Sequence, residues 1–353
     1  MDSLGQGVSK QDGQIIFIHK TLPGEEGSVE ITAQKKGVAF GRLESLVLPS
    51  ADRIESVCPH FTNCPSCHYL HTPYEKELEF KKQSLQKIFQ KLPLPEIKVI
   101  PAMKRLGYRN RIQLHYDTKI KKLGMLNTQL KQIVEVPQCL IGLPAIADEL
   151  KRLYQGGQWL KEAPKNLPQG HVEIYWLNDS LQVNWNKPYA EGGFSQVFEE
   201  MNQMLKKELQ NWEANKYPSD LLDLFAGNGN ISSALNYSRR LCVDIYPKIS
   251  SDEFLSQHLY ADDALKNIKS RLKSLKLTPK TLVLDPPRSG LKELNLWLEH
   301  FQPQHVAYVS CDPHTMARDL AAASGYDLKQ ILLLDFFPST YHFETLIFLE
   351  RKA

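Results

Sequence analysis

The chain has 353 residues, a formal net charge of +3 and 42% hydrophobic residues. At roughly 100 to 200 residues per domain, this length predicts two or three domains with cores of their own. No apolar run reaches the ~18 to 20 residues of a membrane span, and the N-terminus lacks a basic and then apolar secretion signal. We therefore expect a cytoplasmic protein without a membrane segment. In that compartment its six cysteines are expected as ligands, nucleophiles or core residues rather than as disulfides.

The first half of the chain predicts two small domains. Short alternating runs between residues 12 and 48 predict a small β-barrel or curled sheet, of the oligonucleotide-binding type, within residues 1–52. A Cys/His-rich loop follows at 58–71, and then a helical stretch that starts near Pro73 and ends at the prolines of 93–95. With the strand candidates RIQLHYD, QIVEVPQC, HVEIYWL and SLQVNW, residues 53–188 form a predicted central α+β domain.

From about Phe194 the pattern changes to short apolar runs that alternate with helices. The runs DLLDLFAG, RRLCVDI, KTLVLDPP and HVAYVSCDP predict a largely parallel sheet, and LKQILLLDFF with ETLIFLERK predicts a closing antiparallel pair. Residues 189–353 are therefore expected to form a Rossmann-like α/β domain.

The first strand of this domain runs into DLFAGNGNIS, which predicts a glycine-rich turn that opens a helix. Gly227 and Gly229 would let the backbone approach a ligand closely, and Asp244 ends the second strand, where a carboxylate can accept hydrogen bonds from ribose hydroxyls. Ser232 replaces the third glycine of the dinucleotide fingerprint. This pattern is similar to the S-adenosylmethionine pocket of class I methyltransferases, in which Asp262 or Asp263 would reach the adenine amino group.

The next strands predict a catalytic edge. Asp285 and two prolines end one strand, and Cys311 with Asp312 and Pro313 ends the following one, at the carboxyl edge where open α/β sheets hold their chemistry. A thiol there suits covalent catalysis: addition to carbon 6 of a pyrimidine activates carbon 5 toward the sulfonium, and a base then removes the carbon-5 proton. Glu344 is the expected base, ahead of the neighbouring His342.

Two other residues refine this hypothesis. Cys242 lies within an apolar run and is expected in the core. Arg288 follows the two prolines where amine methyltransferases commonly have a stacking aromatic, which argues against methylation of an exocyclic nitrogen.

The segments LDLFAGNGN, LDPPRSG, VSCDPHTMARDL and DFFPSTYHFETLIFLER occur in this order and resemble the RNA uracil-C5 methyltransferases, which make 5-methyluridine in ribosomal or transfer RNA. The resemblance covers nearly the whole chain. It implies Cys311 as nucleophile, Glu344 as base and Asp285 as a cofactor-pocket residue near the reacting centre. It also implies cofactor contacts from Gln196, in GGFSQVF, and from Phe225, Asn230 and Asp244, the last in place of the usual glutamate.

Cys58, Cys64 and Cys67, with the distant Cys139, could supply four thiolates to one metal centre. Zinc is chemically compatible, and His60, His68 or His71 could replace a cysteine. The resemblance favours a [4Fe-4S] cluster that shapes an RNA-binding surface, although Pro65 and Ser66 stand where the family usually has glycines. It also implies that the N-terminal segment is a shortened, incompletely closed TRAM domain.

The expected substrate is one uridine of folded RNA, preferably 23S ribosomal RNA, extruded from its stack into the pocket. The alternatives are the T-loop uridine of tRNA and an inactive RNA-binding iron-sulfur protein. DNA and an obligate protein partner are not expected. Basic residues at 104–105, 109, 111 and 119–122 could face RNA phosphates, and solvated loops explain them equally well from charge alone.

Overall fold

The computed structural model describes residues 1–128, 130–188, 196–214, 216–245, 251 and 253–352. Contacts divide the chain into two compact units. The first contains residues 1–84, 103–198 and 337–342, and the second contains residues 85–102, 199–336 and 343–353. These units differ from the three segments 1–52, 53–188 and 189–353, which remain a prediction.

The N-terminal part of the first unit is a four-stranded sheet in the order β1-β2-β4-β3. Its strands are β1 (Gly7–Gln11), β2 (Gln14–His19), β3 (Glu26–Lys35) and β4 (Val38–Leu48). The strands predicted between residues 12 and 48 are thus confirmed. The buried core of this sheet is small, with Ile16, Ile18 and Ala39 and the partly buried Val29. Because β1 and β3 lie at the two edges of this order, the sheet is open.

The central part of the first unit is a five-stranded sheet in the order β10-β9-β6-β7-β8. Its strands are β6 (Arg111–Asp117), β7 (Lys122–Asn127), β8 (Gln132–Val134), β9 (Gln169–Leu177) and β10 (Ser180–Trp185). Helices α2 (Pro144–Tyr154) and α3 (Gln158–Glu162), joined by the 3-10 turn η1 (Gln155–Gly157), pack on one face, where Leu150 and Trp159 join Leu114 and Val172 in one core. Since side chains alternate along a strand, the odd-numbered residues of β6 and β9 face the other way.

Helix α1 (Tyr74–Ile88) confirms the helix expected after the cysteine loop. It begins in the first unit and ends in the second, where Leu85 and the following Phe89 join the core around β5 (Ile97–Ile100).

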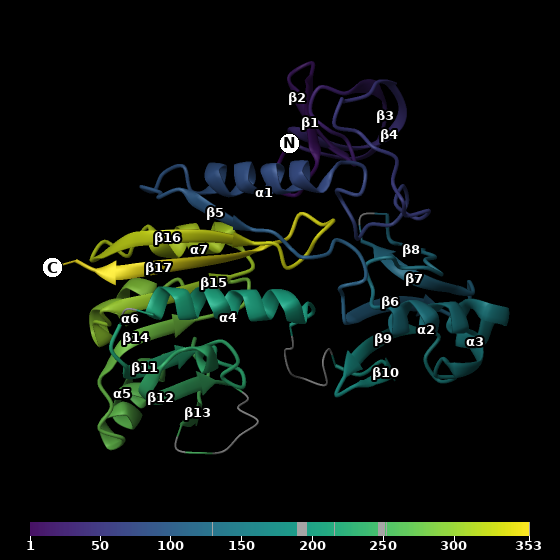
Figure 1. Ribbon diagram of the computed structural model, residues 1–353. Coiled ribbons are helices and arrows are strands. Elements are labelled where there is room, and N and C mark those ends of the chain that lie inside the picture. The colour runs from purple at the N-terminus through teal and green to yellow at the C-terminus, as the bar shows by residue number, and fades with distance from the viewer. Residues whose placement is uncertain (129, 189–195, 215, 246–250, 252, 353) are drawn as a thin grey trace. The chain divides into compact units, whose positions relative to one another are not determined.

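The second unit is built on an eight-stranded sheet in the order β13-β12-β11-β14-β15-β17-β16-β5 (Figure 1). The strands after β5 are β11 (Ser219–Leu224), β12 (Tyr237–Asp244), β13 (Phe254–Ser256), β14 (Pro279–Leu284), β15 (His305–Ser310), β16 (Tyr326–Leu334) and β17 (Glu344–Arg351). All paired neighbours are parallel except the pairs that β17 forms with β15 and β16. The predicted parallel sheet with a closing antiparallel pair is therefore confirmed.

Helices cover both faces of this sheet. Helices α5 (Ala264–Ser274), α6 (Leu294–Phe301) and α7 (Pro313–Leu320) share one core with Ile347 and Leu349 of β17. Helix α4 (Glu199–Glu213) packs on the opposite face, because its Trp212 stacks on Phe348, with ring centroids 4.5 Å apart. Cys242, which lies in β12, is fully buried, as expected.

The prediction of a helix after the glycine-rich turn is wrong. Between β11 and β12 the described residues form only the 3-10 turn η3 (Ser232–Ala234). The serine hydroxyls explain this difference: Ser233 Oγ donates to the carbonyl of Asn230 at 2.7 Å, and Ser232 Oγ donates to the carbonyl of Gly229. Such local bonds compete with the helical backbone ladder.

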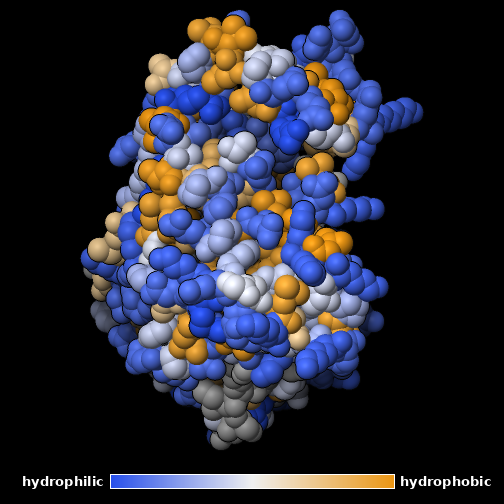
Figure 2. Space-filling view, turned by 90° about the vertical axis from the view of Figure 1, so that its right-hand side faces the viewer, coloured by the Kyte–Doolittle hydropathy of each residue, from blue (hydrophilic) through white to orange (hydrophobic). Residues whose placement is uncertain are grey.

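Among the described residues, no helix has both the length and the apolar character that crossing a membrane requires. The face of the molecule in Figure 2 carries its hydrophobic residues in small groups separated by hydrophilic ones.

Candidate active site and cysteine cluster

Three of the predicted site residues meet at one edge of the second unit's sheet. Asp285 directly follows β14, Cys311 directly follows β15, and Glu344 is the first residue of β17. Ser310 pairs with Thr345 in the antiparallel register of β15 and β17, so the next positions outward are Cys311 and Glu344. The topology therefore brings the expected nucleophile and the expected base next to each other.

Burial and neighbouring charges shift the pKa values of Cys311 and Glu344 at this edge. Burial and, after it, the Glu344 carboxylate raise the pKa of Cys311 to about 12, against the charge of Arg288 and a hydrogen bond from its side chain, which lower it. Burial also raises the pKa of Glu344 well above its usual range, with Asp285 adding to this effect and Arg288 opposing it. Arg288 is thus the cation that favours the ionised form of both groups.

The loop that carries Arg288 is fixed by a buried carboxylate from α7. One oxygen of Asp319 accepts hydrogen bonds from the backbone N–H of Leu291 and from the Tyr308 hydroxyl, both at 2.7 Å. A Cβ at Gly290, where φ is +67°, would lie 2.5 Å from that same oxygen. Only glycine therefore fits the turn between the Pro-Pro segment and α6, where the chain packs against Asp319 of α7.

The segment after Cys311 explains the Cys-Asp-Pro sequence. Asp312 is the N-cap of α7, and its Oδ1 accepts hydrogen bonds from the backbone N–H groups of His314 at 2.9 Å and Thr315 at 3.3 Å. Pro313 occupies the first helical turn, where its missing N–H costs nothing. Strand, thiol and helix start thus follow one another without a loop.

The glycine-rich turn lies at the end of β11 and touches the end of β12. Phe225, Gly227 and Gly229 have positive φ values of 60°, 54° and 72°. The backbone N–H of Gly227 donates to Oδ2 of Asp244 at 2.9 Å. Behind the turn, Arg240 donates to the carbonyl of Gly229 at 3.4 Å and to the Ser232 hydroxyl at 3.1 Å. Arg240 therefore supports the turn where a helix was expected.

The remaining predicted cofactor residues occupy different surroundings. Asn230 exchanges side-chain hydrogen bonds with the buried Asn202 of α4, at 3.0 and 3.3 Å. Asp263 is exposed and accepts from the side chain of Asn267 at 3.0 Å. Gln196 belongs to the first unit, where its carbonyl accepts from Asn110, and residues 192–195 of the predicted GGFSQVF contact lie outside the described residues.

The four predicted metal ligands all belong to the first unit. Cys64 and Cys67 are buried, Cys58 and Cys139 are partly buried, and none of them forms a disulfide. Burial raises the pKa of Cys67 well above its usual range, and Cys64, Cys139 and Cys58 each raise it further. The thiols are thus close enough to act on one another. The structure does not show a metal centre, because the part of the chain that it describes contains no group of three or more ligands arranged for one ion.

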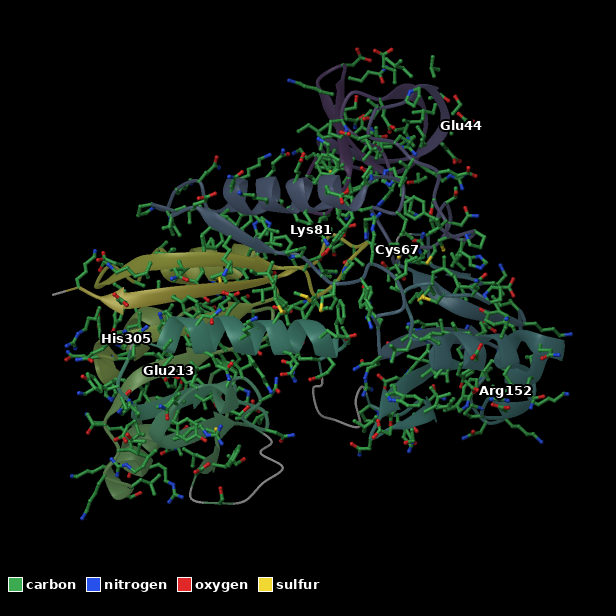
Figure 3. The ribbon with its side chains drawn as sticks, in the orientation of Figure 1. Glu44, Cys67, Lys81, Arg152, Glu213 and His305 are labelled. Carbon is green, nitrogen blue, oxygen red and sulfur yellow. The ribbon has the colours of Figure 1, made fainter. Side chains whose placement is uncertain are left out.

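A lysine from the end of the N-terminal sheet supports this cysteine loop. The ammonium of Lys20 donates to the carbonyls of Phe61, of Thr62 at 3.2 Å and of Cys64 at 2.7 Å. Burial lowers the pKa of Lys20 to about 8, while Cys64, Cys67 and Cys58 oppose this shift. Figure 3 marks Cys67 within this part of the first unit.

The histidines of the loop have other neighbours. Burial lowers the pKa of His71 to about 3, with Arg53 and Glu25 as the next influences, and neither of its ring nitrogens has a hydrogen-bond partner among the described residues. Burial also lowers the pKa of His68 to about 3, and the ring of His68 packs edge-on against Tyr341.

Sequence reasoning missed the supporting residues. Asp319 and Lys20 each act through a contact with a segment distant in the chain, and Arg240 acts on the neighbouring turn. No periodicity or spacing marks such contacts. In the sequence alone, Arg288 stands out only as a departure from the aromatic of amine methyltransferases.

Comparisons with known proteins are consistent with this geometry. Residues 246–352 match the family model described as tRNA (Uracil-5-)-methyltransferase. The chain is 27% identical to the 23S rRNA (uracil(1939)-C(5))-methyltransferase RlmD of Shewanella woodyi, over 99% of this chain and 94% of that protein. It is 28% identical to RlmD of Tolumonas auensis, over 98% of this chain and 93% of that protein.

A solved structure has the same fold. The Pyrococcus abyssi tRNA (uracil-54, C5)-methyltransferase in complex with S-adenosyl-L-homocysteine superposes with a TM-score of 0.67 at 18% identity, over 98% of this chain and 100% of that chain. The chain therefore has the mixed α/β methyltransferase fold. The family model and the relatives that align with nearly the whole chain thus make this protein similar to the RNA uracil-C5 methyltransferases.

Proposed function

We propose that this protein uses S-adenosylmethionine to methylate carbon 5 of a uridine in RNA through a covalent adduct on Cys311. The adjacency of Cys311 and Glu344, with Arg288 donating to the thiol, is the observation that carries this proposal. A nucleophile, a base and a cation gathered at the carboxyl edge of a parallel sheet match the three needs of the reaction.

Each residue has a defined task in the proposed reaction. Arg288 stabilises the thiolate of Cys311, which adds to carbon 6 of the uracil and moves the ring electrons toward carbon 5 and the carbonyl oxygen. When bound, S-adenosylmethionine supplies the electrophilic methyl group. The Glu344 carboxylate then takes the proton from carbon 5, the electron pair restores the ring double bond, and the bond between sulfur and carbon 6 breaks. The raised pKa of Glu344 makes it a stronger base than an exposed carboxylate.

The ends of β11, β12 and β14 are the proposed cofactor pocket. Gly227 and Phe225 would leave open backbone beside the adenosine, Asp244 would accept from the ribose, and Asp285 would lie near the sulfonium. Burial raises the pKa of Asp285 to about 7, so a nearby positive charge would favour its ionised form. We also propose cofactor contacts from Asn230, Asp263 and Gln196.

We further propose that Cys58, Cys64, Cys67 and Cys139 bind a [4Fe-4S] cluster, with zinc as the alternative. Cys64, Cys139 and Cys58 each raise the pKa of Cys67, and together with the nearby Lys20 ammonium these four thiols form a donor set suited to such a centre. When bound, the cluster would supply a rigid cross-link for the loop rather than chemistry at the uracil.

The preferred substrate is 23S ribosomal RNA, because the RlmD relatives that align with nearly the whole chain are named for it. The tRNA T-loop remains the alternative, since the solved neighbour is named for uracil 54 of tRNA. In either case the uridine must leave its stack to reach Cys311. A cytoplasmic location follows as part of the proposal.

A mechanism-based adduct tests this function. RNA that contains 5-fluorouridine should form a covalent complex that survives denaturation and requires both S-adenosylmethionine and Cys311, because fluorine blocks the proton removal that releases the enzyme. Fragments of 23S rRNA and tRNA transcripts should be compared as substrates. Cys311→Ala should reduce methyl transfer by a factor on the order of 10³ or more.

Two controls complete this experiment. Cys242→Ala removes a buried thiol distant in sequence and should leave adduct formation intact in the folded fraction. Normal methylation by Cys311→Ala would refute the covalent mechanism. Binding of RNA without adduct or methyl transfer, with any cellular RNA, would favour an inactive RNA-binding protein.

A further inference from the structure

The first unit contains a hollow of about 450 Å³ on the face of its central sheet that α2 and α3 do not cover. Strand β6 contributes His115 and Asp117, strand β9 contributes His171 and Gln169, and the β7–β8 hairpin contributes Lys122 and Lys131. This volume lies within the usual range of small-molecule sites, about 300 to 1,000 Å³.

The two histidines reach this face together. His115 and His171 are direct cross-strand partners in β6 and β9, and their ring centroids lie 6.4 Å apart. The His171 ring is held by the carbonyl of Lys187, 2.9 Å from its Nε2. Burial and then His171 lower the pKa of His115, so at neutral pH the His115 ring offers both a donor and an acceptor.

The hollow has an excess of unpaired positive charge. Neither Lys122 nor Lys131 has an ion pair or a side-chain hydrogen bond among the described residues. Asp117 is the acidic residue among the lining residues that the structure describes, and its oxygens already accept from Lys119 N–H, Ile120 N–H and the Gln169 side chain. The carboxylate is therefore committed to the β6–β7 turn, and the ammonium groups are left to a ligand.

The structure already engages the other basic residues that the sequence suggested as phosphate contacts. Arg105 pairs with Glu77 at 2.8 Å, and Arg111 pairs with the buried Glu173 at 2.8 Å. Arg109 donates to the carbonyl of Arg111, and Lys104 lies over the ring of Phe198. Of the predicted basic clusters, the run at 119–122 is thus the one that the described structure leaves free for phosphates.

We propose that this hollow binds a nucleotide of the RNA substrate other than the methylated one, with the ammonium groups of Lys122 and Lys131 on phosphates and the imidazoles of His115 and His171 beside the base or ribose. The exposed Ile120 and Leu126 also line the hollow and add the apolar surface that a base needs. This inference rests on the proposed RNA substrate and adds a second contact that fixes the RNA without touching the reacting uracil.

The test compares two double variants of the full chain. Lys122→Ala/Lys131→Ala removes two charges from the hollow, and Lys151→Ala/Lys161→Ala removes two exposed charges from the helices of the same unit. RNA affinity is measured by fluorescence anisotropy between about 50 and 200 mM salt. The hollow variant should bind about tenfold more weakly, and its salt slope should fall by about 1.4 to 1.8, since each phosphate contact contributes about 0.7 to 0.9. The helix variant should stay within about twofold of the wild type.

Methyl transfer distinguishes this inference from the proposed function. At saturating RNA the hollow variant should keep the kcat of the wild type and the yield of the 5-fluorouridine adduct, while its KM for RNA rises. An unchanged salt slope, or an equal loss in the helix variant, would overturn the inference and leave the methyltransferase proposal standing. A wild-type protein that forms neither adduct nor RNA complex would refute the proposed function itself.

Discussion

Cys311 and Glu344 lie opposite each other at the ends of two antiparallel strands, because Ser310 pairs with Thr345 between β15 and β17. Burial and the Glu344 carboxylate hold the pKa of Cys311 at about 12, against the opposing charge of Arg288. In the free protein the thiol and the carboxylate therefore disfavour each other's ionised form, and their titrations are coupled.

Glu344→Gln should lower the pKa of Cys311, because the substitution removes the negative charge and keeps the shape. Arg288→Met should raise it, since both the charge and the hydrogen bond of Arg288 favour the thiolate. The rate of alkylation of Cys311 by iodoacetamide as a function of pH measures both shifts, in a background where the other cysteines are mapped by mass spectrometry. A shift in the same direction for both variants would contradict the proposed arrangement.

Asp223 should make the stability of the second unit depend on pH. Asp223 is 1% exposed, its Oδ2 has no hydrogen-bond partner among the described residues, and burial raises its pKa from 3.8 to about 7. Because the folded-state pKa is the higher one, this stability is fully present below about pH 4 and is lost as pH rises through about 7. A pKa rise of this size corresponds to about 4 kcal/mol in the free energy of unfolding.

Thermal unfolding without ligands at about pH 5.5 and pH 8 measures this effect. Asp223→Asn should reduce the difference between the two unfolding midpoints. Burial also raises the pKa of Asp285 to about 7, so Asp285 should account for part of the remaining difference. Asp327→Asn changes an exposed carboxylate paired with Lys329 and serves as the control. Equal pH dependence in wild type and Asp223→Asn would show that Asp223 is ionised in the folded state.

Arg240 should be a positioning residue for the glycine-rich turn. Arg240→Gln loses the bonds to Gly229 and Ser232 and should weaken S-adenosylhomocysteine binding by about tenfold, the equivalent of about 1.4 kcal/mol. Arg240→Lys keeps the charge and should show a smaller loss of affinity for S-adenosylhomocysteine. Arg239→Gln, the neighbour that pairs with Asp220 at 2.6 Å, is the matched control.

Isothermal titration calorimetry with the folded variants gives these affinities. A purely structural role for Arg240 would lower the unfolding temperature and leave the dissociation constant of the folded protein unchanged, and that outcome would refute the positioning role.

Lys20→Met should weaken metal retention by the cysteine loop. The substitution keeps most of the unbranched side chain and removes the donor to three carbonyls of the loop. Loss of such supporting contacts typically lowers metal affinity by about 10- to 100-fold. Iron, zinc and sulfide content after a chelator challenge, together with absorbance in the iron-sulfur region, measures this loss without any reference to activity. Lys10→Met, an exposed lysine of β1, should retain metal like the wild type.

The ion network around Glu77 should stabilise the first unit far more than a surface network does. Glu77 is fully buried, pairs with the buried Lys81 at 2.7 Å and with Arg105 at 2.8 Å, and accepts from the backbone N–H of Ser339 at 2.6 Å. Glu77→Ala removes the carboxylate that pairs with the buried Lys81 and the partly buried Arg105, and should lower the free energy of unfolding by about 3 to 5 kcal/mol.

Arg152 provides the comparison within the same unit, since it pairs with Glu149 at 2.6 Å and Glu162 at 2.5 Å on the surface (Figure 3). Arg152→Ala should cost about 1 kcal/mol or less. Chemical denaturation of both variants measures the two losses in the free energy of unfolding. Similar losses would show that water reaches the Glu77 network.

Local patterns predicted much of the fold correctly. The expected strands RIQLHYD and SLQVNW coincide with β6 and β10, and the alternating apolar runs after residue 217 became the parallel sheet. The helix after the glycine-rich turn failed because Ser232 and Ser233 bond to nearby carbonyls, an interaction that hydrophobic periodicity does not report.

The sequence by itself identified the residues that are proposed to carry the chemistry: a thiol after one strand, a carboxylate at the start of another and four cysteines in the first half. Only the tertiary structure decided which groups act on them. Arg288 reaches Cys311, Asp319 fixes the Arg288 loop, and Lys20 reaches the cysteine loop through contacts between segments that are distant in sequence. Chain folding brings such groups within a few ångströms, and at that distance burial and neighbouring charges set the pKa values.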